Sequence, residues 1–172
     1  MKLLIIVDFQ NDFVTGSLGF PEAKILEEVI YQKALLYKND GDDVLLTLDT
    51  HSPDYLNTQE GKKLPIIHCI KNTDGWNIFG KVNELEGLRL EKKTFGSVEL
   101  VEYLKDKDYE EIELVGLVSN ICVLSNAIIA KATLPEAKII VDAKATASSD
   151  SILHEKALDV LEGLQIEVRN RG

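Results

Sequence analysis

Three side chains from separate parts of the sequence have the chemistry of nucleophilic catalysis. Cys122 supplies a thiol, Asp8 a carboxylate that could accept the thiol proton, and Lys92 a cation that could hold Asp8 ionised and help to orient a substrate. A cysteine at a helix N-terminus is a usable nucleophile, because the helix dipole favours the thiolate and the backbone N–H groups there can stabilise an oxyanion. The set predicts attack by Cys122 on a carbonyl carbon, with Asp8 as general base.

A second group of residues has the composition of a metal site. Asp49 and His51 are two positions apart, and residues at i and i+2 of an extended segment face the same side, so they can share one cation. His68 can join them from a loop as a third ligand. Mixed nitrogen and oxygen ligands with open positions suit a divalent metal, zinc in the first place, with iron or manganese as alternatives.

Each of these residues also has a plain structural interpretation. An aspartate after a strand is commonly a helix cap, the run Glu91-Lys92-Lys93 could be solvated surface, and the two histidines could simply be hydrogen-bonded in a loop. Cys69 is a rival thiol for which we expect a packing role. His154 is expected on the polar surface of the last helix.

The pattern of elements favours the functional interpretation. Short apolar runs predict strands, and amphipathic runs predict helices between them: strands over 3–7, 44–48, 88–90, 112–117, 138–141 and 165–168, and helices over 21–38, 98–104, 122–133 and 150–161. This alternation predicts a three-layer, doubly wound α/β fold on a mainly parallel six-stranded sheet. Asp8, Asp49, Lys92 and Cys122 each follow a predicted strand, at the carboxyl edge where such sheets bind ligands. Residues 50–88 lack a clear pattern, and a loop that long is usually functional.

Composition narrows the classes of partner. The 172 residues, 45% of them hydrophobic, are expected to form a single domain over 1–172. A formal net charge of −10 excludes the basic footprint of a nucleic-acid binder and argues against an anionic membrane surface. No apolar run approaches the length of a membrane span. Two cysteines, each inside an apolar segment, predict a reducing cytoplasmic location rather than a disulfide framework.

Five motifs together carry a resemblance to a known family: VDFQNDFV at 7–14, LDTH at 48–51, HCI at 68–70, EKKTFGS at 91–97 and GLVSNICV at 116–123. Over nearly its whole length the chain resembles the isochorismatase-like cysteine hydrolases, whose fold is Rossmann-like, and within them the nicotinamidase/pyrazinamidase branch. The resemblance implies that Asp8, Lys92 and Cys122 are catalytic. It favours Lys92 over Lys93, because the family lysine closes a strand before a short stretch containing an aromatic residue and serine.

The resemblance also implies the remaining parts of the site. Asp49, His51 and His68 fall on the family's metal ligands, and a cis peptide is expected at Leu117–Val118. That peptide would direct the N–H groups of Val118 and Cys122 into an oxyanion hole.

The chain departs from the family pattern in two places. The further histidine that many of these amidases have between the last two metal ligands is absent, and Ser119-Asn120 replaces the usual Thr-Asp pair. Asn120 removes a charge near the thiol, which bears on substrate choice. True isochorismatases lack the cysteine and cleave a vinyl ether, so Cys122 argues against that reaction.

The expected activity is hydrolysis of a small flat carboxamide such as nicotinamide to its acid and ammonia, through a thioester, in NAD salvage. The ring nitrogen would lie on the metal, and Phe13, Trp76 and Phe95 are candidate pocket walls, although each could equally belong to the core. Hydrolysis of carbamoyl or ureide substrates is the alternative, and a non-catalytic binding protein on the same scaffold is a further one. The family is often oligomeric, so the resemblance allows a homo-oligomer. No feature of the sequence identifies the surface through which copies would associate.

Overall fold

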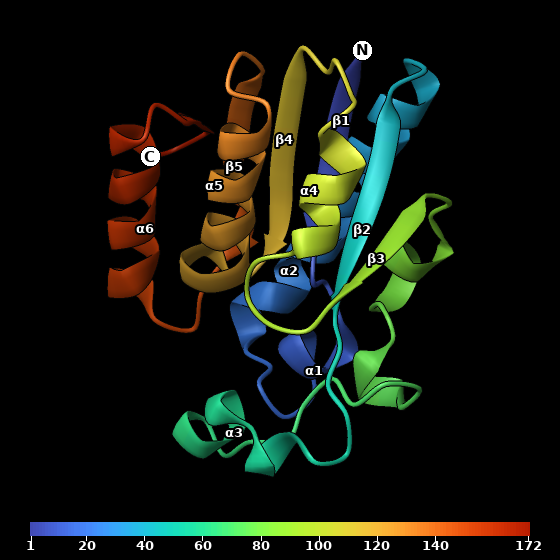
Figure 1. The fold of residues 1–172 in the computed structure, drawn as a ribbon, viewed down its shortest axis with the longest axis vertical. Helices are drawn as coiled ribbons and strands as arrows, with labels where there is room; N and C mark the ends of the chain where they lie inside the picture. Colours follow the sequence, from blue (N-terminus) through green and yellow to red (C-terminus); the bar gives the residue numbers. More distant parts are fainter.

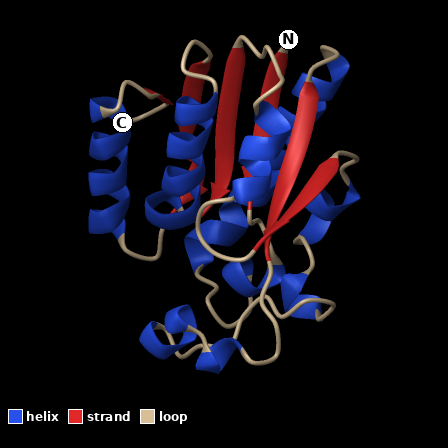
Figure 2. Ribbon diagram, in the orientation of Figure 1, coloured by secondary structure: helices blue, strands red, loops and turns tan.

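The computed structural model describes residues 1–172 as one six-stranded sheet between two layers of helices (Figures 1 and 2). All neighbouring strands are parallel, in the order β3-β2-β1-β4-β5-β6. The strands are β1 (Lys2–Val7), β2 (Asp43–Asp49), β3 (Leu88–Lys92), β4 (Glu111–Leu117), β5 (Lys138–Ala147) and β6 (Glu167–Arg169). The predicted doubly wound α/β fold is confirmed, and the sheet is parallel throughout.

The central strand β1 is apolar on both faces because helices cover both. Leu3, Ile5 and Val7 pack into the core beneath α4, α5 and α6, whereas Leu4 and Ile6 pack into the core beneath α2. Successive side chains of a strand point to opposite faces, so the continuous apolar run serves two separate cores.

Four of the six helices, α2, α4, α5 and α6, cover the faces of the sheet. The six helices are α1 (Asn11–Val14), α2 (Pro21–Asn39), α3 (Gln59–Lys63), α4 (Val98–Leu104), α5 (Leu124–Thr133) and α6 (Ser151–Gly163). Figure 1 shows α4, α5 and α6 in front of the sheet, α2 behind it, and α3 below the carboxyl ends of the strands.

Two predicted boundaries differ in ways that matter for the site. The helix predicted to begin at Cys122 begins at Leu124, and a π-helical turn over Ser119–Val123 precedes it. β5 continues to Ala147, past the polar residues that ended its predicted apolar run, through a register shift opposite β4.

The unpatterned stretch that begins at residue 50 contains structure of its own. It holds α3 and three short turns of 3₁₀ helix, at Tyr55–Asn57, Asp74–Trp76 and Gly80–Glu84. None of the helices combines the length and the hydropathy that a membrane span requires.

A buried ion cluster fastens α2 to the sheet. Lys33 Nζ of α2 lies 2.7 Å from Glu113 Oε1 of β4 and 3.1 Å from Asp142 Oδ2 of β5. Both acidic side chains are at most 4% exposed. Burial alone would raise the pKa of Asp142, but hydrogen bonds from Asn170, the Lys144 N–H and Lys33 outweigh it and lower that pKa. Lys33 therefore supplies the positive charge that faces the two buried carboxylates.

Replacing Lys33 with methionine should leave both carboxylates buried without their cation. We expect Lys33→Met to lower the free energy of unfolding at neutral pH by about 3 kcal/mol, measured by urea denaturation, because breaking a buried ion pair costs on this order.

Lys138→Met is the matched control, because Lys138 pairs with Glu167 at a site where the two side chains are 53% and 40% exposed. It should cost less than about 1 kcal/mol. The contribution of Asp142 is fully present above the ordinary aspartate pKa and is lost as the pH falls through the depressed value, so the Lys33 effect should shrink on strong acidification. Equal losses for the two lysines at neutral pH would contradict this account.

Candidate active site and metal centre

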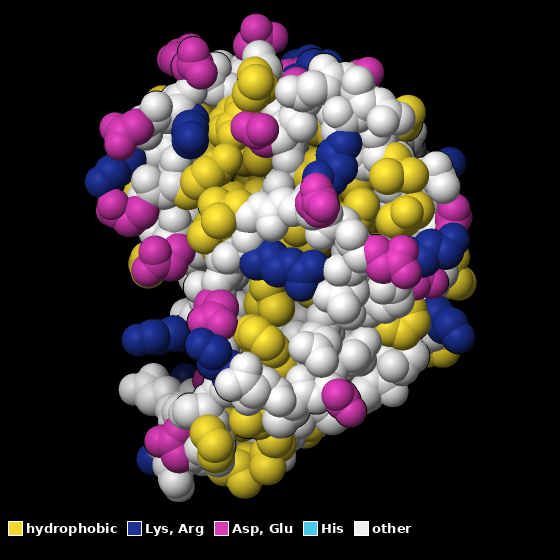
Figure 3. Space-filling view, turned by 90° about the vertical axis from the view of Figure 1, so that its right-hand side faces the viewer, with side chains coloured by type: hydrophobic (Ala, Val, Ile, Leu, Met, Phe, Trp, Pro, Cys, Tyr) yellow, Lys and Arg dark blue, Asp and Glu magenta, His cyan; other side chains and the backbone are white.

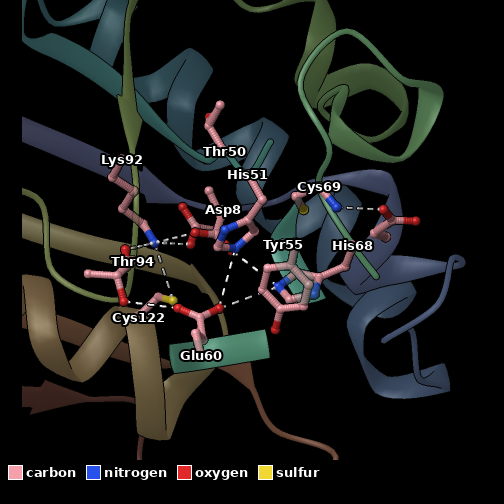
Figure 4. Close-up of polar contacts among 12 residues, drawn as sticks. Asp8, Thr50, His51, Tyr55, Glu60, His68, Cys69, Lys92, Thr94 and Cys122 are labelled. Atoms are coloured by element: carbon pink, nitrogen blue, oxygen red, sulfur yellow. Dashed lines mark hydrogen bonds and ion pairs between the residues drawn. The ribbon is translucent and has the colours of Figure 1, made fainter. Parts of the chain in front are cut away.

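Asp8, Lys92 and Cys122 meet at the carboxyl edge of the sheet, as predicted from their positions after strands. Lys92 Nζ lies 2.6 Å from Asp8 Oδ2 and 3.4 Å from Cys122 Sγ. None of the three residues is more than 6% exposed. Figure 4 shows the lysine reaching between the carboxylate and the sulfur. Lys93 is exposed, so the structure brings Lys92, the lysine expected from the motif, into contact with Asp8 and Cys122.

Local backbone geometry places Asp8 where the chain leaves β1. Asp8 has a φ of +48°, in the left-handed region that aspartate tolerates better than most residues. Its N–H donates to the Thr47 carbonyl, and the Thr47 hydroxyl donates to Asp8 Oδ1 at 2.7 Å. The carboxylate is thus fixed on one oxygen by β2 and on the other by Lys92.

The backbone that leads to Cys122 requires a glycine near the end of β4. Gly116 has a φ of +109°, and a Cβ there would lie 2.2 Å from the Val7 carbonyl oxygen of β1. The Leu117–Val118 peptide bond, one residue further along, is cis, as the resemblance implied.

Asn126 holds the Cys122 segment against the loop that follows Lys92. Its amide donates to the Cys122 carbonyl at 2.8 Å and to the Phe95 carbonyl at 3.0 Å, and its oxygen accepts from the Ser97 N–H. This fully buried side chain therefore ties two parts of the site together.

Burial and one shared cation set the protonation states. Burial raises the pKa of Asp8, with Lys92 opposing the rise. Burial also raises the pKa of Cys122 well above its ordinary value, and the Asp8 carboxylate adds to it. Burial would lower the pKa of Lys92, but Asp8, Cys122 and Asp49 outweigh it and keep the ammonium. Burial thus opposes the thiolate that a helix N-terminus was expected to favour at Cys122.

The predicted metal ligands converge beside this group and gain a fourth member, Glu60 of α3. Asp49, His51, Glu60 and His68 each offer an atom within 4.8 Å of all the others. His51 Nε2 lies 3.0 Å from Asp49 Oδ2 and 3.3 Å from Glu60 Oε2, and His68 Nε2 lies 3.4 Å from Asp49 Oδ2.

The orientation of His68 fits a cation. Its Nδ1 lies 2.8 Å from the Ile66 carbonyl, which can only accept, so Nδ1 carries the proton. Nε2 faces the Asp49 carboxylate at 3.4 Å: a protonated ring donates a hydrogen bond to it, whereas a neutral ring offers its lone pair to a cation between them. Burial would raise the pKa of Asp49, but His51, His68 and Lys92 hold that pKa below its usual range. Two imidazoles and two carboxylates suit zinc, iron or manganese.

Two polar residues that follow β1 form hydrogen bonds to the backbone at or next to the candidate metal ligands. Gln10 accepts from the Asp49 N–H at 2.8 Å and donates to the Asp49 carbonyl at 2.9 Å. Asp12 Oδ2 accepts from the Cys69 N–H, next to His68, at 2.8 Å. A Cβ at Gly75 would come within 2.1 Å of the same oxygen, so glycine is needed where Asp12 passes.

Two contacts join the metal group (Asp49, His51, Glu60 and His68) to the thiol group (Asp8, Lys92 and Cys122). Asp49 Oδ1 lies 3.5 Å from Lys92 Nζ, so this carboxylate faces both groups. The Thr94 hydroxyl donates to Glu60 Oε1 at 3.0 Å, while the Thr94 carbonyl accepts from Lys92 at 2.9 Å.

The three predicted pocket walls lie in different surroundings. The Phe13 ring centroid lies 5.5 Å from that of His68, beside the metal group. The Trp76 indole N–H donates to the hydroxyl of Thr50, which lines the same groove as His51 and Lys92. Phe95 is 44% exposed, outside the buried group.

Sequence reasoning missed Tyr55 and Glu60, both from the unpatterned stretch. The Tyr55 ring is buried and packs on both imidazoles, with centroids 4.6 Å from His51 and 4.9 Å from His68. Glu60 lies between the two predicted histidine ligands, where the family's further histidine was sought, and only a search for carboxylates there could have found it.

A groove of about 990 Å³ leads along β3 to the two groups. Its lining includes His51, Tyr55, Lys92 and Lys93. Figure 3 shows the surface hollowed between the lower part of the molecule, which holds α3, and the rest.

Comparison with known proteins shows the family of the chain. The isochorismatase domain pattern matches residues 2–170, so the chain belongs to the isochorismatase family. It is 30% identical over 171 residues to the uncharacterized isochorismatase family protein PncA of Bacillus subtilis (strain 168), covering 91% of this chain and 92% of that protein. The crystal structure of nicotinamidase/pyrazinamidase PncA from Bacillus subtilis has a TM-score of 0.86 at 27% identity, covering 97% of this chain and 98% of that chain.

Two further solved structures are similar. Pyrazinamidase of Pyrococcus horikoshii in complex with zinc has a TM-score of 0.86 at 22% identity, covering 97% of each chain. N-carbamoylsarcosine amidase from Thermoplasma acidophilum has a TM-score of 0.80 at 25% identity, covering 97% of this chain and 94% of that chain. The chain is a nicotinamidase-like hydrolase of the isochorismatase family, as its motifs implied.

If Glu60 is a ligand, removing its charge should weaken metal binding. We expect Glu60→Gln to raise the dissociation constant for Zn²⁺ about tenfold or more, measured by competition with a chromophoric chelator, because the amide keeps the shape but loses the anionic oxygen.

Glu99→Gln is the control, since it makes the same change at an exposed position of α4 that is not among the four candidate ligands. Its affinity should match that of the unmodified protein. Unchanged affinity in Glu60→Gln would reduce the site to three protein ligands.

Proposed function

We propose that this hydrolase cleaves a small, flat carboxamide of the nicotinamide type to the acid and ammonia, through a thioester on Cys122. The observation that carries the proposal is the buried contact of one ammonium, Lys92, with both the Asp8 carboxylate and the Cys122 sulfur. Such an arrangement allows the thiol proton to move to Asp8 when the sulfur attacks.

Each step balances with these residues alone. Cys122 Sγ bonds to the amide carbon as its proton passes to Asp8, and the carbonyl oxygen becomes an oxyanion held by the N–H groups of Val118 and Cys122. Collapse breaks the C–N bond, and Asp8 gives the proton to the departing nitrogen to make ammonia. Water then attacks the thioester and gives a proton to Asp8. The acid leaves, and the proton returns to sulfur.

Lys92 makes this sequence feasible in a buried site. Its ammonium stabilises the carboxylate before attack and the developing thiolate during attack. Because both partners are buried with it, their charges act at short range with little screening by water.

Asp49, His51, Glu60 and His68 would hold a divalent metal ion, zinc in the first place and iron or manganese as alternatives. When bound, the ion supplies an electrophilic anchor for a substrate atom such as a ring nitrogen. The zinc complex of the Pyrococcus horikoshii pyrazinamidase supports zinc. Phe13, beside His68, is the candidate wall with the best placement for a planar ring.

A carbamoyl or ureide substrate is the second candidate. The similarity to N-carbamoylsarcosine amidase supports it, as does Asn120, whose side-chain oxygen is buried without a hydrogen-bond partner. The intact set of Asp8, Lys92 and Cys122 favours catalysis over a binding protein. We propose a reducing, cytoplasmic location, which would keep both free cysteines as thiols, and leave a homo-oligomer open.

A substrate panel separates the two candidates. We expect the Zn²⁺-loaded protein to release ammonia from nicotinamide faster than from N-carbamoyl amino acids, measured by a coupled ammonia assay. A reversed order would establish the second candidate, and failure to turn over any amide or ureide would overturn the proposal of catalysis.

Substitutions should separate the roles of the two groups. Cys122→Ala should lower kcat by several orders of magnitude without changing metal content, and Asp8→Asn should behave similarly, because an amide cannot accept the thiol proton. His51→Ala should raise KM strongly while Cys122 stays reactive toward an alkylating reagent.

Metal content by elemental analysis provides the control for each variant. If Cys122→Ala kept more than about a hundredth of the activity, a metal-bound water would be the attacking group and the roles assigned here would be wrong.

A further inference from the structure

The sequence predicted His154 on the polar surface of the last helix, but the structure places it against another segment. It is half-buried, and its Nδ1 lies 2.7 Å from the hydroxyl oxygen of Ser119. Ser119 is fully buried and begins the Ser119–Val123 turn, which carries Cys122. The first turn of α6 therefore reaches the turn that presents the thiol, and no step proposed above uses this contact.

The burial of Ser119 fixes the direction of this hydrogen bond. His154 is the one partner that the Ser119 hydroxyl has in the structure. If Nδ1 accepts, the hydroxyl hydrogen is satisfied; if Nδ1–H donates, that hydrogen is left buried without an acceptor, which is costly. The form that fits is neutral imidazole with its proton on Nε2.

The surroundings favour the same neutral form. Burial lowers the pKa of His154, and the charge of Arg171 lowers it further against the opposing charge of Glu155. His154 lies in the first turn of α6, where the helix dipole disfavours a cation. The Asp150 carboxylate caps that turn by accepting from the Ile152 and Leu153 N–H groups. The Ser119–Val123 turn contributes no titratable side chain other than the Cys122 thiol.

The turn is thus held at two points. Asn126 binds the Cys122 carbonyl and faces the loop after Lys92, and His154 binds Ser119 three residues earlier. We propose that His154 is a positioning residue, which in its neutral form fixes the Ser119–Val123 turn so that Cys122 stays aligned with Asp8 and Lys92. This inference rests on the proposed function, because it assigns Cys122 as the nucleophile.

The proposal carries a pH dependence of its own. Protonation converts Nδ1 from an acceptor into a donor, so the Ser119 hydroxyl loses its acceptor and the turn loses one of its two fixed points. Thiol reactivity should therefore fall as the pH drops through the His154 pKa, and a residue that cannot titrate there should remove this inflection.

The test is the rate of Cys122 alkylation by iodoacetamide, with the labelled peptide identified by mass spectrometry, from about pH 5 to pH 8, the range in which histidine titrates. Four single variants at the contact, their double variant and one control are compared with the unmodified protein. His154→Leu and Ser119→Ala remove the hydrogen bond, while His154→Asn and Ser119→Thr keep a neutral acceptor and a hydroxyl. Ser151→Ala, an exposed hydroxyl in the same turn of α6, is the control.

We expect His154→Leu and Ser119→Ala to react about tenfold more slowly at neutral pH, with kcat lowered similarly and KM and Zn²⁺ content unchanged, since misplacement of a reacting group acts on rate. Ser119→Thr should react normally. His154→Asn should react normally at neutral pH and lack the acidic inflection. The double variant Ser119→Ala/His154→Leu should be no slower than either single variant, because the pair acts as one unit.

Three results would overturn the proposal: rates within twofold of the unmodified protein in both His154→Leu and Ser119→Ala, additive losses in the double variant, or an unchanged acidic inflection in His154→Asn. A purely structural role would lower the urea midpoint of His154→Asn and His154→Leu alike without moving that inflection. Alkylation needs no substrate, so absence of amide turnover would count against the proposed function while the alkylation pattern still decides the role of His154.

Discussion

The interaction on which the site depends is the burial of one ammonium group among carboxylates. Lys92 lies within 2.6 Å of Asp8, and Asp49 approaches it at 3.5 Å while also facing the imidazoles. With Glu60, which joins Asp49 among the candidate metal ligands, the site holds three carboxylates and one ammonium, so two negative charges are uncompensated when the imidazoles are neutral. Buried charge is tolerated only when it is paired, and a divalent cation supplies the missing amount. The thiol group and the metal group therefore form one electrostatic unit.

The parallel sheet explains how such a unit can be assembled from distant residues. β1, β2, β3 and β4 all end at the same edge, which brings together Asp8, Asp49 and Lys92 at or just after their strands, and the Ser119–Val123 turn that follows β4 brings Cys122 to them. The precise placement then comes from backbone features: the left-handed conformation at Asp8, the close approach that Gly116 permits, and the amide of Asn126. The reactive groups are thereby fixed by elements that are themselves buried in two cores.

The same reasoning shows what could be predicted from the sequence. The run Leu3–Val7 is apolar because both faces of β1 are covered, and this made the strand and the residue after it predictable. Glu60 and Tyr55 were not, because residues 50–87 contain no strand of the sheet and their positions depend on tertiary contacts. His154 was misplaced because helical periodicity identifies a polar face without showing which residue packs against it. The sequence showed the helix end that favours a thiolate at Cys122 but not the burial that opposes it, because burial depends on tertiary packing.

The segment 50–87 has an evolutionary consequence. Of the four candidate metal ligands, Asp49 alone belongs to a strand, whereas His51, Glu60 and His68 come from this segment. A segment outside the sheet can lengthen, shorten or be exchanged between homologues without shifting strand register. Natural variation in segment 50–87 would alter which molecules the site recognises. Asp8, Lys92 and Cys122 lie outside this segment and would be left unchanged. One scaffold can in this way give rise to enzymes that take different substrates through the same reaction.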